Sequence, residues 1–136
     1  KLVEAEGRTA FTRVVDVRDH AAMVAAVDAG SAQLGVIDVV VANAGISGDD
    51  MGLLSTSYDV WREVIDINLS GVFVTMQLGC RGMVERRGPG AVILVSSIMG
   101  LRSVGGVPAY TASATRFFGP RPSSTCARKW SSASIK

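Results

Sequence analysis

The sequence predicts an α/β fold built around a parallel sheet, and two observations carry that prediction. Residues 36–42 and 91–95 are short, nearly continuous apolar runs, which is typical of strands buried on both faces of a parallel sheet. The long segment between them repeats its apolar residues with the period of a helix. Strands that alternate with helices indicate an α/β architecture.

The first third of the chain is predicted to contain one strand between two helices. Residues 1–7 have the pattern of a last helical turn that ends at Gly7. Residues 9–15 are rich in β-branched side chains and therefore predict a strand. Asp19 is a suitable N-cap for a helix over residues 20–34, which Gly35 ends.

The middle of the chain is predicted to form a long helix. Thr56 and Asp59 have the spacing of a capping box, so the helix is expected to begin there and to reach about Glu85. A turn at residues 88–90 leads into the strand of residues 91–95, and a glycine-rich loop over residues 96–106 follows. The helix residues expected to face the core are Trp61, Val64, Ile65, Asn68, Leu69, Val72, Phe73, Met76, Cys80 and Met83.

The composition indicates a globular protein of about one domain. The chain has 136 residues, of which 48% are hydrophobic and 19% are charged. Its apolar runs are far shorter than the roughly 20 residues of a membrane helix, and no secretory signal is visible. Two cysteines cannot build a disulfide framework, and no Cys/His spacing suits zinc. We therefore expect a cytoplasmic protein without a metal site or a membrane partner.

Charge is unevenly distributed along the chain. From Ala114 onward the sequence contains five basic residues and no acidic one, whereas the preceding part is acidic overall. A basic tail is one signal for nucleic-acid binding. Because no aromatic interleaving or recognition motif accompanies these charges, we expect no nucleic-acid partner.

Polar side chains follow the predicted strands at their carboxyl ends, where open parallel sheets bind ligands. The residues at these ends are Asp16 and Val17, then Asn43, Ala44 and Gly45, and finally Ser97. Each group also has a structural interpretation, because Asp often ends strands, Asn and Gly often make tight turns, and a Ser-Ser pair often caps a helix or turn. Their shared location indicates one site.

Asn68 lies in the apolar stripe of the long helix. A buried amide there must find hydrogen-bond partners or cost on the order of 1 to 3 kcal/mol. A kink in the helix with a bound water would satisfy it, and so would a bond to nearby backbone. The first interpretation is functional and the second is purely structural.

Ser97 and Tyr110 are thirteen residues apart, and the segments around them, 95–100 and 107–114, resemble the active-site stretch of the short-chain dehydrogenase/reductase family. Together with the strand-end residues and Asn68, the resemblance covers residues 1 to about 113. It implies an incomplete Rossmann-type doubly wound parallel sheet, with the third to fifth strands and their helices present. It also implies NAD or NADP as cofactor and an alcohol or ketone as the small-molecule substrate.

The resemblance assigns roles to the candidate residues. Ser97 would polarise a carbonyl oxygen and Tyr110 would protonate it, as hydride reduction of a ketone requires. Asn68 would support a proton relay. Asp16 and Val17 would meet the adenine ring, and the segment from Asn43 through Ala44 to Gly45 would border the cofactor. Intact relatives pair through the helices after Asn68 and after Tyr110, so a homo-oligomer is expected.

The chain departs from the family at position 114, where Ala114 replaces a lysine. The family's lysine lowers the pKa of the catalytic phenol and holds the nicotinamide ribose, whereas a free phenol has a pKa of about 10. We therefore expect weak or no activity. Gly119, Pro120 and Pro122 would also break the helix expected next. We hypothesise a local reading-frame error over residues 114–124 or a degenerate gene. The chain is accordingly divided into a partial Rossmann domain, 1–113, and an aberrant basic segment, 114–136.

The phosphate-binding glycine turn of the family is also missing from the chain. In the family's strand order, the first and second strands lie between the strand expected at residues 9–15 and the one at residues 36–42. Their absence leaves a gap of about 14 Å at roughly 4.8 Å per strand spacing, which hydrogen bonds cannot bridge. We expect that this chain alone does not hold the native sheet.

Residues 1–8, 16–19 and 39–46 resemble a mycofactocin-linked, carveol dehydrogenase-like branch of the family, whose members interconvert secondary alcohols and ketones. A 3-oxoacyl carrier-protein reductase is an alternative within the family. Outside enzymology, the alternatives are a non-catalytic dinucleotide-sensing or interaction module and a nonfunctional fragment.

Overall fold

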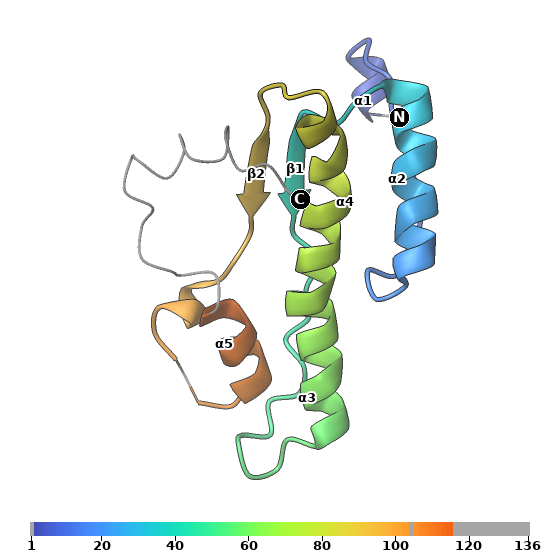
Figure 1. Ribbon diagram of the computed structural model, residues 1–136. Helices are drawn as coiled ribbons and strands as arrows, with labels where there is room; N and C mark the ends of the chain where they lie inside the picture. The colour runs from blue at the N-terminus through green and yellow to red at the C-terminus, as the bar shows by residue number, and fades with distance from the viewer. Residues whose placement is uncertain (1, 104, 116–136) are drawn as a thin grey trace, which may run out of the picture.

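The computed structural model describes residues 2–103 and 105–115, so the predicted segment beyond residue 115 lies outside the described residues. Along the chain come a short helix, a long helix, a strand, a nearly continuous long helix, a second strand and two more helical segments (Figure 1). The elements are α1 (Leu2–Ala5), α2 (His20–Leu34), β1 (Val39–Ala42), α3 (Tyr58–Ile65), the π-helix η1 (Asp66–Ser70), α4 (Gly71–Glu85), β2 (Ala91–Leu94), the 3-10 helix η2 (Ile98–Gly100) and α5 (Pro108–Thr115).

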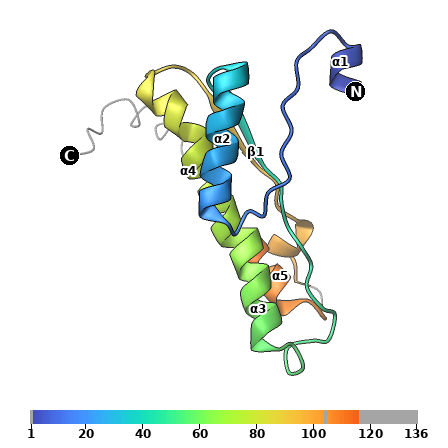
Figure 2. The ribbon, with the colours of Figure 1, turned by 90° about the vertical axis from the view of Figure 1, so that its right-hand side faces the viewer.

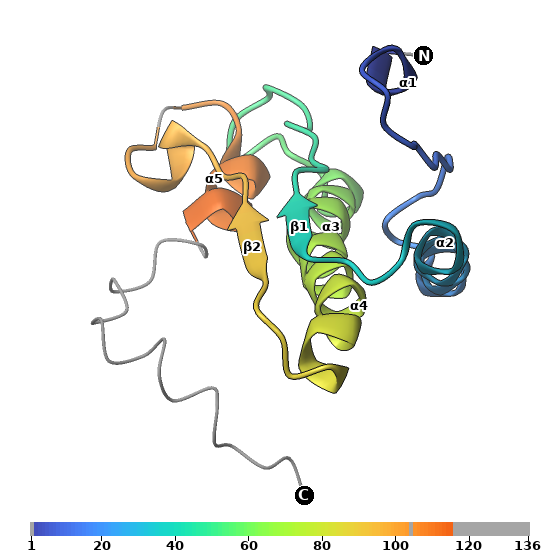
Figure 3. The ribbon, with the colours of Figure 1, turned by 90° about the horizontal axis from the view of Figure 1, so that it is seen from above.

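Strands β1 and β2 form a parallel pair, which confirms the predicted α/β class (Figure 3). Val39 pairs with Ala91 and Ala42 pairs with Leu94, so the two carboxyl ends lie at the same edge. The strand predicted at residues 9–15 is wrong, because these residues form no strand and Val14 is fully exposed. Among the described residues the sheet has two strands, β1 and β2.

Burial of the two strands differs from the prediction that both faces are covered. Val40 and Ala42 are buried, whereas Val39 and Val41 are 54% and 53% exposed. Every residue of β2 is exposed. Successive side chains of a strand point to opposite faces, so one face of β1 is covered and the other is bare. Helix α4 packs against β1 and covers that face (Figure 1).

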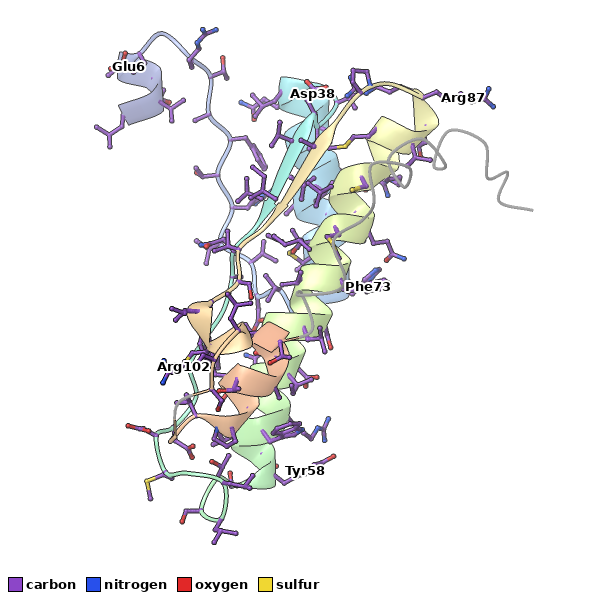
Figure 4. The ribbon with its side chains drawn as sticks, turned by 90° about the vertical axis from the view of Figure 1, so that its left-hand side faces the viewer. Glu6, Asp38, Tyr58, Phe73, Arg87 and Arg102 are labelled. Carbon is purple, nitrogen blue, oxygen red and sulfur yellow. The ribbon has the colours of Figure 1, made fainter. Side chains whose placement is uncertain are left out.

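Helix α4 approaches β1 closely because a glycine lies at the contact. A Cβ atom on Gly79 would lie 2.5 Å from Val40 Cγ2, well inside normal contact distance. Met83 and Leu78 are buried on the same helix. Phe73 was expected in the core, but it is 56% exposed and points away from the strands (Figure 4). It follows buried Val72 by one residue, which turns it about 100° around the helix.

The long helix begins at Tyr58 and ends at Glu85, as predicted to within two residues. Its N-cap is Ser57 and not Thr56: the Ser57 hydroxyl accepts a hydrogen bond from the Val60 amide at 3.2 Å. The Thr56 hydroxyl instead donates to the Gly52 carbonyl at 2.9 Å. Thr56 therefore fastens the preceding loop, and the capping-box prediction is wrong by one position.

Helix α2 matches its predicted bounds. Asp19 caps it by accepting from the Ala22 amide at 2.9 Å, and Gly35 ends it with a φ of +91°. The helix packs beside α4 (Figure 2), where Asp28 and Arg81 form an ion pair. Within residues 2–103 and 105–115, none of the helices has the length and apolarity needed to cross a membrane.

Candidate active site

A cavity of about 240 Å³ opens beyond the carboxyl ends of β1 and β2. The first strand contributes the turn that follows Ala42, the second contributes residues 95–97, and η1, α4 and α5 close the remaining sides. Its lining consists of Asn43, Ala44, Gly45, Ile46, Ser47, Asn68, Val72, Val95, Ser96, Ser97, Tyr110, Ser113 and Ala114. The structure thus brings Asn43, Ala44, Gly45, Asn68, Ser97 and Tyr110 to one cavity, as the resemblance implies.

Asn68 is buried in the π-helical turn η1, and all of its side-chain polar atoms have partners. Its Oδ1 accepts from the Ile46 amide at 2.9 Å, and its Nδ2 donates to the Ile46 carbonyl at 2.9 Å. A second Nδ2 hydrogen bond reaches Ser113 Oγ at 3.1 Å. The amide therefore fixes the loop after β1 to the long helix through the backbone bonds of the structural interpretation, and it lies in a π-turn, a feature that is frequent at functional sites. Its part in a proton relay stays a prediction.

Ser113 connects that amide to the segment of Tyr110. Its hydroxyl donates to the Tyr110 carbonyl at 2.8 Å and accepts from Asn68. The sequence reasoning did not single out Ser113, although its position one helical turn after Tyr110 placed it on the same side of α5. Ile46, Ser47 and Ser96 were likewise not proposed as lining residues, and adjacency to the two predicted motifs is the signal that could have found them.

Ser97 lies at the start of η2, where its oxygen accepts from the Met99 amide at 3.2 Å. This is the turn-capping role considered in the sequence analysis. The bond uses a lone pair of the oxygen, so the O–H group remains a donor for a group in the cavity. Neighbouring Ser96 donates to the Ala114 carbonyl at 3.1 Å and ties the end of β2 to α5.

Tyr110 lies in the first turn of α5 and is partly exposed to the cavity. Ala114 follows it by one turn, is buried, and also lines the cavity. A methyl group therefore occupies the position at which the resemblance expects an ammonium group.

Asp16 and Val17 do not line this cavity. Arg18 holds the Asp16 carboxylate through side-chain hydrogen bonds and a backbone amide bond, and these bonds place the pKa of Asp16 below its usual value. Arg18 also pairs with Glu63 of α3 at 3.3 Å. Val17 packs against Gly71, where an added Cβ would lie 2.6 Å from Val17 Cγ2. These contacts fasten the segment before α2 to the long helix.

The loop after β1, which borders the cavity, is joined to the loop after η2. The Gly52 amide donates to the Gly106 carbonyl at 3.0 Å. Gly106 has a φ of +104°, and a Cβ there would collide with the Asp50 carboxylate. Glycine suits this crossing because of its positive φ, and the hydrogen bond holds the loop after β1 and the loop after η2 together.

The chain belongs to the short-chain dehydrogenase family, because the family model for short chain dehydrogenases matches residues 1–118. An uncharacterised oxidoreductase of Mycobacterium tuberculosis is 41% identical over 105 residues, which cover 77% of this chain and 37% of that protein. A 3-oxoacyl-[acyl-carrier-protein] reductase of Chlamydia muridarum is 36% identical over 118 residues, or 87% of this chain and 47% of the reductase.

The crystal structure of carveol dehydrogenase from Mycobacterium avium in complex with NAD has the same fold. Its TM-score is 0.81 at 38% identity, and the match covers 84% of this chain and 41% of that one. The comparison confirms the Rossmann-type fold class predicted for the chain. The chain spans less than half the length of each of these relatives.

Proposed function

We propose that the protein containing this chain is an NAD- or NADP-dependent oxidoreductase that interconverts a secondary alcohol and a ketone. The observation that carries the proposal is the meeting of Ser97 and Tyr110 at one cavity beyond two parallel strands, next to the fully bonded amide of Asn68. The carveol dehydrogenase-like branch supplies the preferred substrate class, an uncharged secondary alcohol.

The cavity residues support the proton half of this reaction. A bound nicotinamide cofactor supplies or accepts the hydride. When a ketone is reduced, negative charge grows on its oxygen; the Ser97 hydroxyl donates a hydrogen bond to that oxygen and the Tyr110 phenol transfers a proton to it. In alcohol oxidation the proton moves in the reverse direction, from the substrate hydroxyl to Tyr110.

The described residues fit one end of a dinucleotide. The turn of Asn43, Ala44 and Gly45 lines the cavity, and a Cβ on Gly45 would lie 3.3 Å from Asn68 Oδ1, so a larger residue there would press on the Asn68 amide. These residues would border the nicotinamide end, with Asp16 and Val17 assigned to the adenine by family resemblance. The glycine turn that the family resemblance implies for the phosphates is not found in residues 2–103 and 105–115.

Ala114 weakens the proposed site, and its replacement provides the experiment. In the intact protein that contains this chain, Ala114→Lys adds a positive charge one helical turn from Tyr110. We expect NAD reduction with a secondary alcohol, followed by absorbance, to rise about 100-fold or more, the scale of general acid–base effects. Thr115→Lys is the control, since it adds the same charge at an exposed neighbouring position. Equal rates for the Ala114→Lys and unsubstituted proteins contradict the proposal that position 114 limits activity.

Ala114 also favours a second candidate, a dinucleotide-binding module without catalysis. That candidate predicts measurable NAD affinity and no turnover even with lysine at position 114. Assays with a cyclic secondary alcohol and a 3-oxoacyl thioester separate the preferred enzyme from a 3-oxoacyl carrier-protein reductase.

We further infer that the intact protein is cytoplasmic and pairs with a second copy through α4 and α5. Exposed Phe73 and Val84 on α4 support a partner on that helix. Light scattering of the intact protein checks the oligomeric state.

A further inference from the structure

Ser113 is the most buried polar side chain among residues 2–103 and 105–115, with 1% of its surface exposed. A hydroxyl in such a site must have hydrogen-bond partners, and Ser113 has one in each direction. It donates to the Tyr110 carbonyl at 2.8 Å and accepts from Asn68 Nδ2 at 3.1 Å. The site thus uses both the donor and the acceptor capacity of the hydroxyl.

These bonds belong to a continuous chain of hydrogen bonds among residues that line the cavity. The backbone of Ile46, in the loop after β1, bonds to Asn68 through both its amide and its carbonyl. Asn68 bonds to Ser113, and Ser113 bonds to Tyr110. Three separate parts of the chain are linked in this way: the loop after β1, the π-turn η1 and the first turn of α5.

We propose that Ser113 is a positioning residue that sets the location of Tyr110 relative to Asn68 and the loop of Ile46. The inference rests on the proposed oxidoreductase function. It predicts that the hydroxyl, and not the volume of residue 113, determines turnover, because only a group that donates and accepts can hold both partners. Loss of the hydroxyl leaves one buried N–H of Asn68 without a partner and removes the side-chain bond that holds α5, which carries Tyr110, to Asn68.

The experiment compares Ser113→Thr with Ser113→Val in the intact protein, with and without Ala114→Lys. Both variants add a methyl group, and they differ only in whether the second branch is a hydroxyl or a methyl. We expect the valine variant to lower kcat about tenfold or more relative to the threonine variant, the scale of one buried hydrogen bond. The Kd for NAD should agree within about twofold, because Ser113 positions the reacting phenol and not the cofactor.

A second measurement, amide hydrogen exchange, reports on the hydrogen bonds that link Ile46, Asn68 and Ser113. The Ile46 amide donates to Asn68, so its hydrogen exchange should be about tenfold faster in the valine variant, while amides in the middle of α4 keep their rates. Thr115→Val is the matched control, since the Thr115 hydroxyl donates to the Thr111 carbonyl at 2.8 Å on the same helix but is exposed. It should change neither kcat nor Ile46 exchange.

The outcomes separate this inference from the proposed function. Equal kcat values for the threonine and valine variants, or equal Ile46 exchange, overturn the positioning role. Absence of turnover in the unsubstituted protein and in its Ala114→Lys form refutes the proposed function, and Ile46 exchange then decides the role of Ser113 alone. If the added methyl prevents both variants from folding, Ser113→Ala against the unsubstituted protein provides the same comparison.

Discussion

Replacement of Asn68 by aspartate is predicted to destabilise the protein in a pH-dependent manner. The change exchanges one NH₂ group for an oxygen and keeps the shape of the side chain. The remaining Oδ1 still accepts from the Ile46 amide, but the Nδ2 bonds to the Ile46 carbonyl and to Ser113 are lost. The new oxygen faces the Ile46 carbonyl, which was 2.9 Å from the nitrogen that it replaces.

The hydrogen bonds in the structure give a scale for the decrease in the free energy of unfolding. Ser113 can turn its hydroxyl toward the carboxylate only by giving up its hydrogen bond to the Tyr110 carbonyl, so one of these two side-chain bonds is missing in either case. Each unsatisfied buried group costs about 1 to 3 kcal/mol, and a charged group costs more. Loss of the two Nδ2 hydrogen bonds therefore predicts a decrease of about 2 to 6 kcal/mol in the free energy of unfolding at pH 8.

The pH dependence follows from burial of the new carboxyl group. Burial and the facing carbonyl favour the protonated form, so the pKa of the introduced carboxyl is raised in the folded state. A group with a raised folded-state pKa stabilises the protein below its unfolded pKa, and this contribution is lost as the pH rises through the folded pKa. When protonated, the carboxyl can donate to the Ile46 carbonyl, so the deficit should shrink at low pH.

Urea denaturation of the intact protein at pH 5 and pH 8 provides the assay. Gln77→Glu is the control because Gln77 is exposed on α4 and undergoes the same change of amide to carboxylate. We expect the control to change stability by less than about 0.5 kcal/mol at either pH. A deficit for Asn68→Asp no larger than that of the control, or one that is the same at both pH values, would refute the role assigned to the Ile46 and Ser113 bonds.

Three further predictions concern other contacts. Gly79→Ala should destabilise the protein by about 1 kcal/mol in urea denaturation, because the clash with Val40 exceeds the gain in helix propensity. Gly30→Ala in α2 should be neutral or stabilising, since its Cβ meets only the side chain of Phe11. Equal effects of the two substitutions would contradict the close packing of α4 on β1. Ser57→Ala should cost about 1 kcal/mol and Ser57→Asp little, as expected for an N-cap, and equal losses would argue against the cap. The Asp16 carboxyl, followed by NMR, should have a pKa below its ordinary value because Arg18 bonds to it. Its contribution to stability is then present above the unfolded-state pKa and disappears as the pH falls through the lowered folded-state pKa. Arg18→Gln should return the Asp16 pKa toward its ordinary value, and an unchanged titration in that variant would contradict the assigned cause.

Local signals predicted the helices well. The bounds of α2 follow from Asp19 and Gly35, and the end of the long helix lies at Glu85, as expected. These helix ends depend on hydrogen bonds between residues that are close together in the sequence, so a local sequence pattern is sufficient to predict them. The N-cap of α3 is an exception, because Thr56 and Ser57 both suit a cap and only the bond from Thr56 to Gly52 distinguishes them.

Features that depend on distant parts of the chain were predicted less well. Residues 9–15 have the composition of a strand, but a strand needs a hydrogen-bonding neighbour, and the described residues provide none. The exposure of Val39 and Val41 has a similar cause, since apolar composition does not reveal whether a second layer is present.

The residues of the candidate site were predicted through spacing and motif, which place Asn68, Ser97 and Tyr110 at the cavity. The same reasoning missed Ser113, because a serine in a helix is common and its importance comes from a bond across 45 residues of sequence. Asp16 and Val17 lie elsewhere, at the Arg18 and Gly71 contacts, and their assigned role stays a prediction.

The π-turn at Asp66–Ser70 holds one residue more than an α-helix with the same total rotation. Removal of one residue there would restore a regular helix and leave α3 and α4 close to their present alignment. A one-residue deletion or insertion in α4 between this turn and Gly79 would instead rotate the two ends of the long helix by about 100° relative to each other. Either Asn68 would then leave the backbone of Ile46 or Gly79 would leave Val40. We therefore expect a single-residue length change before Gly79 to be tolerated less well than the loss of one residue from the π-turn.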